Sequence, residues 1–61
     1  MKKIMYYWKN WENCEPIVKH IEMAFPCWVV VSQAFGYVRI ECRKEDYNRI
    51  KELLENENKM S

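Results

Sequence analysis

Two stretches of the chain repeat apolar residues at the 3.6-residue period of an amphipathic helix. The first stripe ends before Pro26, and Asn13 precedes it as a candidate N-cap with Pro16 in the first turn. The second stripe follows Glu45 and Asp46, which suit the positive end of a helix. Beyond it, we expect the tail over 56–61 to fray. The apolar positions of the two stripes are Cys14, Ile17, Val18, Ile21, Ala24 and Phe25, and then Tyr47, Ile50, Leu53 and Leu54.

Three other stretches, over 2–9, 27–33 and 37–43, are rich in aromatic and β-branched residues and predict strands. The first of them alternates with a period of two. Both of its faces are nevertheless apolar, with Ile4, Tyr6 and Trp8 on one side and Met5 and Tyr7 on the other.

The turn between the second and third strands decides which side chains of the second strand point toward the core. We expect a three-residue loop over 34–36, because the glycine then takes the left-handed conformation. This loop places Trp28 and Val30 on the side of Val38 and Ile40. A two-residue loop would place Val29 and Val31 there instead, but it requires a positive φ at Phe35.

The resulting order, β-α-β-β-α, predicts one small α+β domain over 1–61. A right-handed crossover puts the third strand between the first two, so we expect an antiparallel or mixed sheet of order 1-3-2 with both helices on one face. This arrangement is a ferredoxin-like unit lacking its last strand. The missing strand leaves the edge of the first strand unpaired and the second face of the sheet open.

The composition gives no indication of catalysis. The chain has one glycine, which excludes a glycine-rich phosphate loop, and one histidine, with no nucleophile placed beside it. We therefore expect neither an enzyme nor a cofactor. Three scattered cysteines without a C-x-x-C pair predict no metal site and indicate free thiols in a reducing, cytoplasmic compartment. No segment has the length of a membrane span.

One octapeptide of the chain is similar to a sequence motif of a known family. The stretch 33–40, Gln-Ala-Phe-Gly-Tyr-Val-Arg-Ile, resembles the ribonucleoprotein octapeptide of RNA-recognition motifs, and 6–11 is loosely similar to the hexamer that accompanies it. The resemblance implies that Tyr7, Phe35 and Tyr37 stack unpaired bases on the open sheet face. The chain differs from the family pattern by Gln33 and Ala34 in place of a basic residue and glycine, and by Ile40 in place of an aromatic residue.

Charge and aromatic content favour a protein partner. Ten Lys and Arg against nine Asp and Glu leave a formal charge of +1, which does not suit a binder of duplex DNA. Aromatic, Met and Arg residues are enriched at the centres of protein interfaces. We expect a small non-enzymatic protein that forms a homodimer and that binds and inhibits or regulates a larger protein, as a phage-type viral accessory factor or an antitoxin does. The alternative is a single-stranded RNA-binding module.

The residues expected at this partner-binding or dimer face are Met5, Tyr7, Trp11, Val29, Val31, Phe35, Tyr37 and Arg39.

Overall fold

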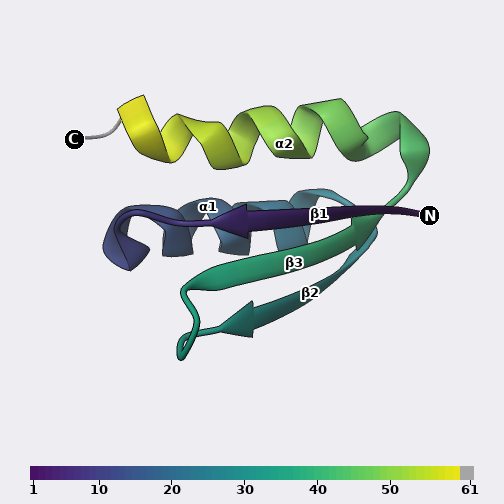
Figure 1. Ribbon diagram of the computed structural model, residues 1–61. Helices are drawn as coiled ribbons and strands as arrows, with labels where there is room; N and C mark the ends of the chain where they lie inside the picture. Colours follow the sequence, from purple (N-terminus) through teal and green to yellow (C-terminus); the bar gives the residue numbers. More distant parts are fainter. Residues whose placement is uncertain (60–61) are drawn as a thin grey trace.

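The computed structural model describes residues 1–59 and consists of three strands and two α-helices (Figure 1). In chain order the elements are β1 (Lys2–Tyr7), α1 (Trp11–Ala24), β2 (Cys27–Ser32), β3 (Tyr37–Cys42), a 3₁₀ turn η1 (Lys44–Asp46), α2 (Tyr47–Glu55) and a second 3₁₀ turn η2 (Asn56–Lys59).

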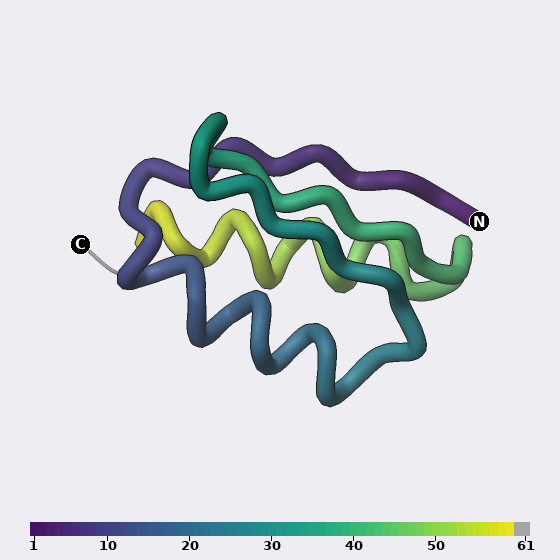
Figure 2. Tube along the Cα trace, turned by 90° about the horizontal axis from the view of Figure 1, so that it is seen from below, coloured from purple at the N-terminus to yellow at the C-terminus, as the bar shows by residue number. Residues whose placement is uncertain are grey.

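The strands form an antiparallel sheet of order β1-β3-β2, which confirms the α+β class and the predicted order 1-3-2. Ile4 pairs with Ile40 across β1 and β3, and Val29 pairs with the same Ile40 across β2 and β3. Both outer strands run antiparallel to β3, so no part of this sheet is mixed. Figure 2 shows the two helices on the same side of the strands.

The hydrophobic core lies between this side of the sheet and the two helices. Both helical stripes contribute to it, except that Ala24 of the predicted first stripe is exposed and Phe25 follows the helix as its C-cap. Two of the cysteines act as small core residues. Within residues 1–59 the buried apolar side chains are Ile4, Cys14, Val18, Ile21, Val38, Ile40, Cys42, Ile50 and Leu54. Because strands alternate, every second residue of β3 is in this set, and the residues between them point to the other face.

The predicted three-residue loop between β2 and β3 is wrong. Ser32 pairs with Tyr37, so the turn has four residues, 33–36, and closes where the Gly36 N–H donates to the Ser32 carbonyl over 2.9 Å. Gly36 takes the left-handed conformation as expected, with φ 74°, and it is the one residue of the described range 1–59 with a positive φ. In the four-residue turn the positive φ falls on Gly36 alone, and Phe35 keeps a negative φ.

The four-residue turn places every side chain of β2 on the face opposite to the one predicted. Val29 and Val31 lie opposite Ile40 and Val38 on the helix side, while Trp28 and Val30 lie on the open side. A two-residue turn would have given the same two faces, because it differs from the observed turn by two residues and side chains alternate with a period of two. Since a one-residue change of register moves every side chain to the other face, one extra loop residue is enough to expose Trp28.

Helix α1 begins three residues earlier than predicted. Its N-cap is Asn10 and not Asn13: the Asn10 Oδ1 accepts the Glu12 N–H over 2.9 Å. Pro16 therefore lies inside the helix and leaves the carbonyl of Glu12 without its usual donor. A contact with the C-terminal segment also holds the backbone just before this start.

That contact involves Glu57, in the segment expected to fray. Residues Asn56–Lys59 form η2, and only 3% of Glu57 is exposed. Its carboxylate accepts the backbone N–H groups of Lys9 and Asn10, over 3.0 and 2.6 Å, and the hydroxyl of Tyr6. The tail is therefore tied to the β1–α1 connection through residue 59, and residues 60–61 lie outside the described part of the chain.

Candidate binding face

The face of the sheet away from the helices presents three rows of side chains, because residues paired across antiparallel strands point to the same side. The middle row holds Met5, Arg39 and Val30. One flanking row holds Tyr7, Tyr37 and Ser32, and the other holds Lys3, Glu41 and Trp28. We call these nine residues, with Phe35 in the adjoining turn, the open face.

Aromatic rings cluster at the turn end of the open face. The rings of Tyr7 and Tyr37 lie 5.6 Å apart at 59°, and those of Phe35 and Tyr37 lie 6.5 Å apart at 24°. Tyr7 is 63% exposed and Phe35 is 76% exposed. These separations are typical of interacting aromatic pairs, so the three rings form one continuous, solvent-accessible surface.

Arg39 occupies the centre of the open face and is half-buried there. Among the described residues, both ion pairs belong to Arg43, so the Arg39 guanidinium has no carboxylate within ion-pair distance. An arginine with free donors among Met5 and Val30 is suited to bind a carboxylate or a phosphate of another molecule.

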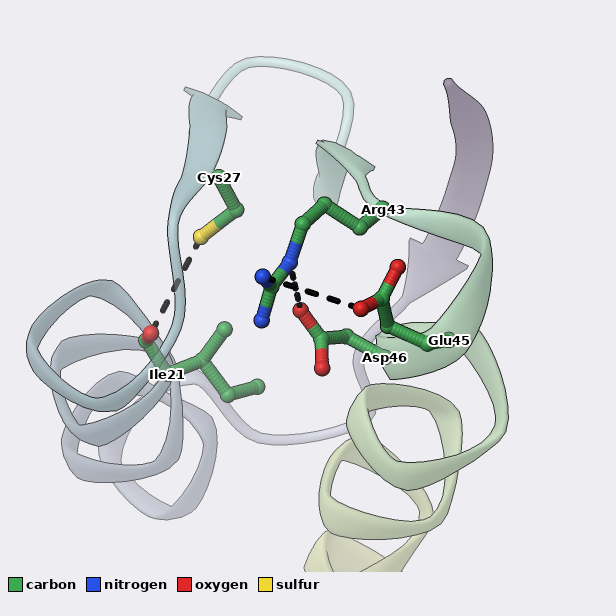
Figure 3. Close-up of polar contacts among 5 residues, drawn as sticks. All are labelled: Ile21, Cys27, Arg43, Glu45 and Asp46. Atoms are coloured by element: carbon green, nitrogen blue, oxygen red, sulfur yellow. Dashed lines mark hydrogen bonds and ion pairs between the residues drawn. The ribbon is translucent and has the colours of Figure 1, made fainter.

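The opposite end of the open face has an apolar corner around Trp28, which is 67% exposed. A shallow hollow of about 480 Å³ lies beside it, and its lining consists of Met1, Pro26, Cys27, Trp28, Glu41 and Arg43. Arg43, one of these residues, is held by two acidic side chains (Figure 3): its Nε donates to Asp46 Oδ2 over 2.8 Å, and its Nη1 lies 3.7 Å from Glu45 Oε2. The Cys27 Sγ lies 3.8 Å from the Ile21 carbonyl oxygen (Figure 3).

The structure brings together five of the eight residues expected at a partner-binding face: Met5, Tyr7, Phe35, Tyr37 and Arg39. It separates the other three from them. Val29 packs on the core and Val31 lies at its margin, both on the helix side, for the reason of register given above. Trp11 stands at the start of α1 and packs on Trp8, with ring centroids 4.4 Å apart.

Trp28 and Val30 belong to the open face, although the predicted three-residue loop placed them on the helix side. The unfavourable positive φ at Phe35 disfavours a two-residue loop, but it does not distinguish a three-residue turn from the observed four-residue turn. The local sequence therefore carries no signal that would have found these two residues.

A second polar cluster joins Tyr6, Glu57 and the β1–α1 connection. Burial alone would raise the pKa of the Glu57 carboxyl, but hydrogen bonds from Tyr6, Asn10 and Lys9 outweigh it and hold this pKa below its usual value. Burial and the Glu57 charge together raise the pKa of Tyr6. We call Tyr6, Glu57 and the backbone amides bonded to Glu57 the latch; every buried side-chain polar atom of the described residues has a hydrogen-bond partner.

The three cysteines are free, and their environments do not activate them. Burial, with a smaller contribution from the Glu57 charge, raises the pKa of Cys14 to about 11. Burial also raises the pKa values of Cys27 and Cys42, which lie opposite each other on β2 and β3 and form no disulfide. At neutral pH all three are thiols, the form that is a poor nucleophile and a poor metal ligand.

Residues 1–59 contain no group of three or more His, Cys, Asp or Glu side chains close enough to hold a metal ion. No helix in this part of the chain has both the length and the apolar character needed to cross a membrane. No family model matches the sequence, and no curated protein or solved structure was found to match it.

Proposed function

We propose that this chain is a non-enzymatic binding protein whose open face contacts, and thereby regulates, a larger protein. The observation that carries the proposal is the position of the exposed apolar side chains. Of the seven large apolar side chains that are exposed in the described residues, four belong to the open face: Met5, Tyr7, Trp28 and Phe35, each at least 46% exposed. Grouped exposure of this kind is a mark of interaction sites, whereas single exposed apolar residues are ordinary.

The chemistry of the open face defines the partner. Its apolar and aromatic side chains suit an apolar patch, and the free guanidinium of Arg39 suits a carboxylate near the middle of that patch. Lys3 and Glu41 lie in the row beside it, where charges fix orientation more than they add affinity. The order of elements also supports the finer proposal that the fold is a ferredoxin-like unit lacking its last strand.

A specific observation favours a second candidate, binding of single-stranded RNA. The three aromatic residues implied by the resemblance to RNA-recognition motifs form the continuous surface at the turn end, and bases stack on such surfaces. Arg39 could then contact a phosphate. We rank this candidate second because the open face also carries Glu41 and because the net charge of the chain is only +1.

The test compares open-face variants with a matched variant on the helix surface. Immobilised wild-type protein, Arg39→Glu, Trp28→Ser and Lys19→Glu are each exposed to lysate of the source cells, after circular dichroism has shown that all four fold. Lys19 is exposed on α1, so Lys19→Glu makes the same charge change as Arg39→Glu on the other side of the molecule. We expect one protein retained by the wild type and Lys19→Glu and lost from both open-face variants.

A protein retained equally by all four forms would contradict the proposal. The RNA candidate is tested in parallel by titrating oligouridylate while following intrinsic fluorescence at low and high salt. Binding that weakens steeply with salt and disappears in Tyr37→Ser would establish that candidate and displace the first.

A further inference from the structure

The two edges of the sheet differ in how they are protected from other strands. Natural edges carry charges, prolines or bulges that prevent pairing. Edge strand β1 has Lys2 and Lys3, whereas edge strand β2, Cys-Trp-Val-Val-Val-Ser, has no charge, no proline and no glycine. Its pairing with β3 continues over all six residues without a bulge. Figure 1 shows β2 at the margin of the sheet, with no other described segment beyond it.

We propose that two copies of this chain associate through β2, edge to edge and antiparallel, to form one continuous six-stranded sheet. An edge strand presents unpaired backbone N–H and C=O groups, and a strand of the same kind satisfies them. Such an interface is isologous, with one surface patch used by both subunits.

The absence of charge makes β2 the edge that suits a second copy. In a β2 pair neither strand brings a charged side chain to the contact. A β1 pair would place Lys2 and Lys3 of each copy along the paired edge, and two open faces stacked about their centre would bring Arg39 onto Arg39. Of these three arrangements, β2 pairing is the one that adds no charge to the contact.

The alternation of side chains restricts the register. A two-fold axis perpendicular to the sheet keeps the helices of both copies on one side, which requires that the two residues of each pair share a face. Pairing centred on Val30 meets this condition and leaves Pro26, which has no N–H to donate, outside the ladder.

In this register, Val31 lies opposite the partner subunit's Val29 on the helix side. Val31 is 38% exposed in the single chain and would be covered in the pair. Trp28 lies opposite the partner subunit's Ser32 on the open side. The open faces of both copies stay accessible, so the proposal does not rest on the proposed function.

Sedimentation velocity over roughly 1 to 200 µM tests the association. The wild type should change from monomer to dimer as concentration rises. Val31→Lys, which places a charge at the paired edge, should remain monomeric across the range. Met23→Lys makes a comparable change at an exposed position of α1 and should dimerise like the wild type. A wild type that stays monomeric, or a Val31→Lys variant that dimerises, would overturn the proposal.

Hydrogen exchange on the wild type keeps the test independent of whether Val31→Lys folds. Amides of β2 should exchange more slowly at the concentration where the dimer forms, while those of β1 stay unchanged. A dimer that protects β1 amides and leaves β2 amides unchanged would contradict the proposed edge. Tyr7→Ser, a change on the open face, should leave dimerisation intact, so failure here and failure of the proposed function give different results.

Discussion

The two sides of strand β1 are both apolar, but one side is buried and the other is exposed to solvent. Ile4 points toward the helices and is 6% exposed, whereas its neighbour Met5 points away and is 46% exposed. Two helices can cover one face of a three-stranded sheet, and a strand that is apolar on both faces therefore keeps one of them in contact with solvent. Apolar character alone therefore does not identify the core. The apolar face that no helix covers is the place to look for binding.

The largest difference should appear when each of these two neighbours is truncated to alanine. Ile4→Ala should lower the free energy of unfolding by about 2 to 5 kcal/mol, because it removes buried methyl groups and leaves a cavity. Met5→Ala should change it by less than about 0.5 kcal/mol, since its side chain is half in solvent. Urea denaturation of the two variants measures both values. Equal losses would mean that the open face is as buried in solution as the helix side.

The next largest effect should come from the latch at Glu57. Glu57→Gln places an amide against N–H groups that need an acceptor, and we expect a loss of about 1.5 to 3 kcal/mol, the range for hydrogen bonds to a charged group. Glu55→Gln, a change on the exposed surface of α2, is the matched control and should be close to neutral. Thermal unfolding of both variants at neutral pH checks the difference.

The latch also predicts a dependence on pH. The pKa of Glu57 is lower in the folded protein than its ordinary value of 4.5, so its contribution to stability is present above that value. It is lost as pH falls through the lowered folded pKa. The stability difference between the wild type and Glu57→Gln should therefore be constant from neutral pH down to about 5 and shrink below about 4.5. A difference that grows on acidification would contradict the assigned hydrogen bonds.

The smallest effect concerns the turn that sets the two faces of β2. Gly36 has φ 74°, and an added Cβ would meet no atom within 4 Å, so Gly36→Ala should cost only the strain of the left-handed conformation. We expect about 1 kcal/mol, measured by urea denaturation. Phe35→Ala, at the exposed neighbouring position, should be close to neutral. A neutral Gly36→Ala would indicate a different turn and reopen the assignment of Trp28 to the open face.

The sequence by itself determined the local elements and their order. Periods of 3.6 and 2 placed both helical stripes and all three strands, because amphipathic patterns follow from side-chain geometry alone. The order β-α-β-β-α then restricted the sheet to 1-3-2. On the candidate face, the alternation of β1 and β3 was sufficient to group Met5, Tyr7, Tyr37 and Arg39.

The faces of β2 and the hydrogen bonds of the β1–α1 connection follow from the tertiary fold and not from the local sequence. The faces of β2, and with them the positions of Trp28 and Val29, depend on one residue of turn length, which local propensity does not resolve. The backbone before α1 is held by the buried carboxylate of Glu57, which is 47 residues from Asn10 in sequence. A polar side chain in a hydrophilic tail looks like a solvated one until the fold brings donors to it. The periodic pattern therefore fixes the elements, whereas their ends and exposed faces are decided by partners far away in the chain.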